Sequence, residues 1–269
     1  MKRASVMVAL LAVIPILVPS AESQDLEEQL RREQRREREL MFRQGIEETS
    51  QLIVMITDQL GSAPSFGAGI LLGRDHDRLY IATANHVVRR GKQEPTSIRV
   101  ALKFEPNKSV PAKLLDRCNP SLDVAVLAIE GWAKQGIAAC SIHFGTSLAV
   151  PRFETSIVYA IGNPNGDAWR PPSPDTLVSA APQELRFRSA FLGVGFSGGG
   201  LLDERGVLAG MVVRDEPPMG SAVPLDAVLQ LVASWGYPVQ LHNLNYEGDH
   251  IVLEKAARTG DIVALTAEL

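Results

Sequence analysis

Between residues 51 and 213 the chain is a succession of short apolar segments separated by turn-forming residues, and this pattern restricts its fold most. Short runs rich in Val, Ile and Leu, bounded by Gly, Pro, Asn and Asp, are typical of β-strands. The stretch 224–236 instead places apolar residues at helical spacing, with a proline in its first turn. The pattern predicts an all-β protein with a C-terminal helix. Strands are expected over 51–56, 67–72, 79–84, 97–104, 110–115, 123–129, 156–161, 177–180, 185–189, 200–202 and 207–213.

Residues 1–23 have the composition of an export signal. Lys2 and Arg3 precede an apolar run over 4–18, and Ala21 and Ser23 offer a small-residue cleavage site before Gln24. The run is shorter than the roughly 20 residues that span a bilayer. We therefore predict an exported protein, periplasmic or secreted, with no stable membrane span once the signal is cleaved. An uncleaved signal that anchors the protein in the membrane is the alternative.

The segment 24–50 is dense in charge and predicts a helix. Pairs such as Glu27–Arg31 and Glu28–Arg32 stand four residues apart with the acid first, which is the favourable order on a helix. Large apolar residues are too few for a convincing heptad seam. Two interpretations stay open: a solvated helix, or a weak coiled coil that gives self-association through 24–48.

Composition excludes several classes of function. The 269 residues are 45% hydrophobic and 22% charged, as in a soluble globular protein large enough to bury a core. A net charge of −4 does not indicate a nucleic-acid surface. The histidines outside the predicted site have no metal-ligand spacing, so we predict no metal and no cofactor; they are His76, His143, His242 and His250.

The stretch 191–202 places Ser197 in a run of glycines directly before a short apolar segment. Gly195, Gly198 and Gly199 free the backbone for conformations that a side chain forbids. A serine in such a loop is well placed to be a nucleophile beside two backbone N–H groups. A glycine-rich turn without chemistry is the alternative, so partners for the serine have to come from elsewhere in the chain.

Two residues can supply those partners. His86 directly follows the strand predicted over 79–84, and Asp123 stands at the beginning of a strongly apolar strand. An unpaired carboxylate is costly to bury, so Asp123 needs a partner such as an imidazole. Taken singly, each residue also fits a turn position without a catalytic role.

His86, Asp123 and Ser197 follow one another in this order along the chain, and each stands at a strand margin. In this arrangement the chain resembles the trypsin-like serine proteases, and among them the HtrA (DegP-like) branch. The resemblance covers about 51–237. The residues that carry it are Gly67-Ala68-Gly69, Thr83-Ala84-Asn85-His86-Val87-Val88, Leu122-Asp123-Val124-Ala125-Val126-Leu127, Gly162-Asn163-Pro164, Gly195-Phe196-Ser197-Gly198-Gly199 and Ala222-Val223-Pro224.

The resemblance implies two antiparallel six-stranded β-barrels packed face to face, within a protease domain over 51–240. Barrel 1, about 51–138, would carry His86 and Asp123, and barrel 2, about 147–224, would carry Ser197. No PDZ-like module is expected after this domain, and the role of the tail 241–269 is unreadable from its sequence.

The resemblance also implies a serine endopeptidase that cleaves polypeptide substrates through an acyl-enzyme. Ser197 would be the nucleophile, His86 its general base and Asp123 the group that orients the imidazole. The backbone N–H groups of Gly195 and Ser197 would form the oxyanion hole.

The implied substrate pocket contains no acid over 189–195, so a small or apolar residue is expected before the cleaved bond rather than Lys or Arg. The pocket residues by resemblance are Phe191, Leu192, Gly210, Met211 and Val212.

Phe196 and Gly200 depart from the family pattern. The family usually has a polar residue where Phe196 stands, directly before the serine, and commonly Pro or Ala where Gly200 stands. These departures support an alternative function, a catalytically idle domain of this fold that binds protein. An esterase with the same triad but without a groove for an extended peptide is a third interpretation.

Cys118 and Cys140 are the only cysteines. In an exported chain an even pair favours one disulfide, here between the loop before Asp123 and the end of the strand that follows it. Two separate buried thiols are the alternative.

Overall fold

The computed structural model describes residues 21–60, 63–89, 95, 97–138, 142, 144–146, 157–164, 169 and 173–243. The export signal predicted over 1–23 falls almost wholly outside these residues, and so does most of the tail 241–269. The chain divides between Leu40 and Met41 into two units, which are described separately.

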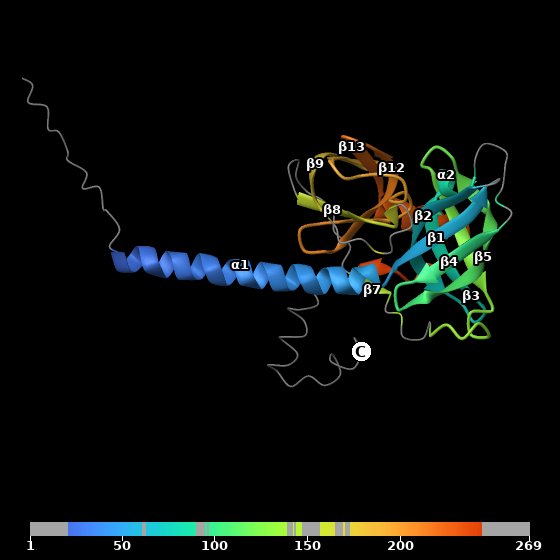
Figure 1. Ribbon diagram of the computed structural model, residues 1–269, viewed down its shortest axis with the longest axis horizontal. Helices are drawn as coiled ribbons and strands as arrows, with labels where there is room; N and C mark the ends of the chain where they lie inside the picture. Colours follow the sequence, from blue (N-terminus) through green and yellow to red (C-terminus); the bar gives the residue numbers. More distant parts are fainter. Residues whose placement is uncertain are drawn as a thin grey trace, which may run out of the picture. The chain divides into compact units, whose positions relative to one another are not determined.

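The first half of the larger unit is a closed antiparallel barrel with the strand order β1-β2-β3-β6-β5-β4 (Figure 1). Its strands β3 and β6 pair over their whole lengths, and almost every residue of both is buried. A hairpin turn between Arg74 and Arg78 joins β2 to β3. The strands of this barrel are β1 (Ile53–Leu60), β2 (Ala63–Arg74), β3 (Arg78–Ala84), β4 (Ile98–Leu102), β5 (Glu105–Asn119) and β6 (Val124–Glu130).

The second half is another closed barrel, with the order β10-β13-β12-β11-β8-β9. Two closed six-stranded antiparallel barrels confirm the predicted fold class. A strand over Met219–Pro224 was not predicted, because glycine, serine and proline give this segment a weak strand signal. The strands are β8 (Ile157–Ile161), β9 (Pro174–Ala181), β10 (Glu184–Arg188), β11 (Gly200–Leu202), β12 (Leu208–Glu216) and β13 (Met219–Pro224). A separate parallel pair joins β7 (Gly145–Thr146) to β14 (His242–Asn243).

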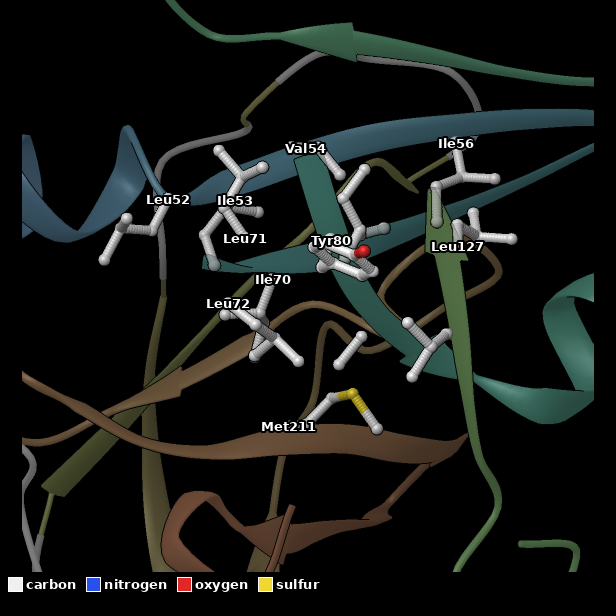
Figure 2. Close-up of a cluster of buried hydrophobic side chains, with 14 of the residues drawn as sticks. Leu52, Ile53, Val54, Ile56, Ile70, Leu71, Leu72, Tyr80, Leu127 and Met211 are labelled. Carbon is white, nitrogen blue, oxygen red and sulfur yellow. The ribbon is translucent and has the colours of Figure 1, made fainter. Parts of the chain in front are cut away.

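One hydrophobic cluster fills barrel 1 and continues into the interface with barrel 2. Met211 of β12 is fully buried in this cluster, and Figure 2 shows its side chain pointing toward the buried residues of barrel 1. A second, smaller cluster fills barrel 2 and includes Leu177, Phe187 and Phe196. The shared cluster holds the two barrels against each other, since separating them would expose its apolar surface to water.

Two helices accompany the barrels. Helix α3 (Leu225–Ser234) confirms the predicted C-terminal helix, begins directly after Pro224 and buries Leu225, Val228 and Val232. Helix α1 (Ala21–Ser50) confirms the predicted charged helix. Among the described residues, no helix is long and apolar enough to cross a membrane.

The end of α1, Met41–Ser50, packs against both barrels. Phe42 packs against Tyr159 of β8 with ring centroids 4.4 Å apart and the ring planes tilted by 42°. The Thr49 hydroxyl donates to the Gly206 carbonyl over 2.8 Å, while Glu47 pairs with Lys103 at the end of β4 over 3.1 Å. This part of the helix therefore ties the β11–β12 turn of barrel 2 to barrel 1.

The predicted Cys118–Cys140 disulfide is not seen. Cys118, the last residue but one of β5, is a half-buried free thiol, and its side chain packs against the main hydrophobic cluster. Cys140 lies outside the described residues.

The close approach of Gly45 to the β11–β12 turn gives a test of this helix contact. A Cβ at Gly45 would lie 2.1 Å from the Arg205 carbonyl oxygen, so Gly45→Ala forces the helix away from the barrel. We expect the free energy of unfolding to fall by about 1–3 kcal/mol, measured by urea denaturation. Arg43→Ala, an exposed position on the same helix, is the matched control and should unfold as the wild type does. Equal stability of all three proteins would contradict the contact.

Candidate active site

The structure brings His86 and Asp123 into direct contact. The imidazole Nδ1 of His86 lies 2.5 Å from Asp123 Oδ2, and the His86 backbone N–H donates to Asp123 Oδ1 over 2.9 Å. A carboxylate only accepts hydrogen bonds, so Nδ1 carries the proton and Nε2 is left as the basic nitrogen. The His86 side chain is 49% exposed, so this nitrogen can meet a substrate from solvent.

Local structure explains how the two side chains meet. His86 lies on α2 (Asn85–Val88), a single helical turn that follows β3 and was not predicted as a helix. Asp123 closes the turn between β5 and β6 with a φ of 57°, a left-handed conformation that aspartate tolerates better than most residues. The Asp123 carbonyl also accepts the Asn85 N–H over 2.9 Å. The side chain and the backbone carbonyl of Asp123 are therefore both bonded to the turn that carries His86.

The segment Ser189–Gly199, called the serine loop below, buries Leu192 and Phe196 in barrel 2 and touches barrel 1 at Ser197 and Gly198. The Ser197 carbonyl accepts the Ala68 N–H of β2 over 2.9 Å. A Cβ at Gly198 would lie 2.0 Å from the Ala68 carbonyl oxygen and 2.5 Å from Thr83 Oγ1. Thr83 stands three residues before His86, so the serine loop is held against the strands that present the histidine.

The loop approaches Ser197 through a tight turn. The Phe196 N–H donates to the Gly193 carbonyl over 3.3 Å, and Gly195 has a φ of 108°. A positive φ at the third position of such a turn is the pattern of a type II turn and favours glycine. The Gly195 carbonyl accepts the Asn163 N–H over 2.8 Å. The peptide between Gly195 and Phe196 is thus held at both its carbonyl and its N–H, whereas the Gly195 N–H makes no backbone bond to any described residue.

Phe196, which departs from the family pattern, is an anchor for this turn. Its side chain is buried and packs in the hydrophobic cluster of barrel 2. An apolar residue therefore holds the loop through burial at the position where the family has a polar one. Gly200, the other departure, lies on β11 next to Leu208, and a Cβ there would come within 2.8 Å of that side chain.

The predicted substrate-pocket residues fall into two groups. Phe191 on the serine loop is 60% exposed, while Leu192 is buried. On β12, the side chains of Met211 and Val212 are fully buried, and the Val212 backbone exchanges hydrogen bonds with Gly198 and Gly199. The β12 segment therefore supports the serine loop, and its Met211 and Val212 side chains are not open to a substrate.

A buried acid that we did not predict lies beneath the serine loop. Asp175 of β9 is 6% exposed and faces a small cavity with room for about one water molecule. Burial raises the pKa of Asp175 to about 6, and a hydrogen bond with the Ser189 side chain partly offsets this. The cavity is lined by Ala160, Ser173, Asp175, Ser189, Phe191, Leu192 and Phe196.

Several residues around the site were missed. Ala68 and Asn163 belong to motifs that carried the family resemblance, but no role was assigned to them. Asp175 stands two residues before Leu177 on a strand, and this spacing places both on the same face. Its neighbour Leu177 is fully buried, so the alternation could have marked Asp175 as an inward-facing acid.

The raised pKa of Asp175 predicts a stability change with pH. Because this pKa is higher in the folded protein than the ordinary value of 3.8, the stabilisation is present below that value and is lost as the pH rises through about 6. Each unit of difference corresponds to about 1.4 kcal/mol. We expect Asp175→Asn to lack this loss, measured as the free energy of unfolding between pH 4 and 7.5. Glu184→Gln, which removes an exposed carboxylate of the same barrel, should keep it. A loss of the same size in Asp175→Asn would assign it to other groups.

Comparison with known proteins identifies the family. The model of the trypsin-like peptidase domain matches residues 67–211, which is more than half of the chain. The chain therefore belongs to the trypsin-like peptidase domain family, and the resemblance noted from its motifs is confirmed. Membership supports a serine protease, which is a hydrolase.

Solved structures share the fold. A crystal structure of the serine endoprotease from Yersinia pestis aligns with a TM-score of 0.55 and 21% identity, over 72% of this chain and 65% of that one. The HtrA-type protease AlgW, solved with a tripeptide, aligns with a TM-score of 0.57 and 20% identity, over 72% of this chain and 62% of that one. The chain thus spans less than two thirds of the length of each.

Proposed function

We propose that this chain is an exported serine endopeptidase in which His86, Asp123 and Ser197 form the catalytic triad. The observation that carries the proposal is the 2.5 Å contact between His86 Nδ1 and Asp123 Oδ2. The Ala68 bond that holds Ser197 against the same barrel supports it. In this organisation, residues 1–23 are the export signal, 24–50 a charged helical segment and 51–240 the protease domain.

The proposed reaction follows from these residue types. His86 Nε2 takes the proton of the Ser197 hydroxyl as its oxygen attacks the carbonyl carbon of the scissile bond. Asp123 stabilises the imidazolium that forms. The N–H groups of Gly195 and Ser197 stabilise the oxyanion, each by roughly 3 kcal/mol. The intermediate collapses to an acyl-enzyme, His86 gives its proton to the leaving amine, and water then hydrolyses the ester with His86 again as the base.

The shape of the serine loop argues against an idle domain. Phe196 raised that alternative, yet its burial in barrel 2 and the turn at Gly195 hold the loop in place. A binding domain without activity has no need for the His86–Asp123 contact. The esterase interpretation shares the triad and differs only in its substrate.

Labelling with a fluorophosphonate probe tests for an activated serine. We expect the mature wild type to label, and Ser197→Ala and His86→Ala to give no signal. Asp123→Asn should slow labelling by roughly three to four orders of magnitude, because the wrong imidazole tautomer is favoured. Ser221→Ala, a buried serine of barrel 2, is the matched control and should label normally. A folded wild type that does not label would favour the idle binding domain.

The apolar character of the serine loop supports a substrate preference. Phe191 and Val194 are 60% and 64% exposed, and the loop contains no charged residue. Asp175, the buried acid beneath it, faces a cavity with room for about one water molecule. We therefore propose small or apolar residues before the cleaved bond.

Cleavage-site mapping on an unfolded protein substrate tests this preference. We expect apolar residues to exceed Lys and Arg before the cleaved bond by about tenfold or more, as read by mass spectrometry of the products. The Ser197→Ala protein provides the background. Predominant cleavage after Lys or Arg would contradict the proposed preference.

A further inference from the structure

The cavity beneath the serine loop joins a buried acid to the segment that carries Ser197. The Ser189 side chain, at the start of the loop, is hydrogen-bonded to the Asp175 carboxyl group. Ser189 Oγ also accepts the Phe191 N–H over 3.3 Å, and the Ser189 N–H donates to the Pro218 carbonyl over 3.0 Å. A continuous chain of bonds thus runs from Asp175 through Ser189 into the loop.

Side chains of the same loop line the cavity. Leu192 and Phe196 line it and are buried. Phe196 directly precedes Ser197 and is the acceptor of the Gly199 N–H over 2.9 Å. Any change that opens the cavity therefore displaces residues on both sides of the turn at Gly195.

No described charged group faces Asp175. On β8, its register partner Val158 is apolar and Tyr159 points to the other side, where it packs against Phe42. On β10, Phe187 points inward, whereas the charged residues of that strand, Glu184, Arg186 and Arg188, are exposed. The serine loop itself contains no titratable residue besides serine. A charge on Asp175 has only Ser189 and about one water molecule to stabilise it.

We propose that Asp175 is a positioning residue for the serine loop: its neutral form is compatible with the packed loop, and its ionisation loosens the loop that carries Ser197. The physical reason is that a carboxylate in a nearly dry cavity gains free energy by reaching water. Reaching water requires displacement of Ser189, Leu192 and Phe196. The inference rests on the proposed function only where it concerns catalysis by Ser197.

Proton linkage gives the size of the effect. Asp175 has a pKa of about 6 in the closed loop and the ordinary 3.8 once solvated. The opening equilibrium of the loop then rises by about tenfold between pH 5 and pH 7. Removal of the carboxylate abolishes this rise.

Hydrogen exchange measured by mass spectrometry on the full chain tests the inference. Wild type and Asp175→Asn are compared at the same pH, because the intrinsic exchange rate itself depends on pH. For peptides that cover 189–197, the ratio of the wild-type to the variant exchange rate should rise by about tenfold from pH 5 to pH 7. The ratio for β1–β3 peptides should stay constant, and Glu184→Gln should behave as the wild type.

A second variant keeps the test decisive if Asp175→Asn does not fold. Ser189→Ala removes the hydrogen bond that lowers the pKa of Asp175, so the pH at which the loop loosens should move upward. Two results would overturn the inference. One is a ratio of the wild-type to the Asp175→Asn exchange rate that does not change with pH. The other is a Ser189→Ala protein whose loop loosens at the same pH as that of the wild type.

Fluorophosphonate labelling of the same samples separates this inference from the proposed function. Labelling that requires Ser197 supports the protease whatever the exchange data show. A folded wild type that does not label but loosens with pH as described would reject the protease and leave the control of the loop by Asp175 standing.

Discussion

The bond from the Ala68 N–H to the Ser197 carbonyl is the contact on which the proposed site depends, because it joins the barrel that carries the serine to the barrel that carries the histidine. Such a close approach of two backbones requires glycine, and Gly198 has no room for a Cβ beside Ala68. The contact also requires a fixed relation between the barrels. The hydrophobic cluster that runs from barrel 1 to Met211 supplies it.

The end of α1 adds a second link between the barrels. It contacts Tyr159 and the β11–β12 turn of barrel 2, and it pairs with Lys103 of barrel 1. Surface ion pairs of this kind contribute little by themselves. The close packing of Gly45 against the turn is therefore the more important part of the link, since it leaves no freedom for the helix to shift.

Polar groups in the site are stabilised in two different ways. Asp123 and His86 are partly exposed and satisfy each other, so their pairing does not depend on a dry environment. Asp175 is buried with only Ser189 as a described partner, so its ionisation is disfavoured. The first arrangement suits a group that exchanges protons with a substrate. The second suits a group whose state is coupled to the conformation of the loop above it.

Local patterns in the sequence determined most of the strands, both long helices and the motifs that hold His86, Asp123 and Ser197, because alternation, turn residues and glycine runs are properties of neighbouring residues. The tertiary structure decided the rest. It placed Ala68, Asn163 and Asp175 around the serine loop, showed that Phe196 anchors this loop, and buried Met211 and Val212. These features arise between strands far apart in the chain, where packing and hydrogen bonding depend on barrel register rather than on any local pattern.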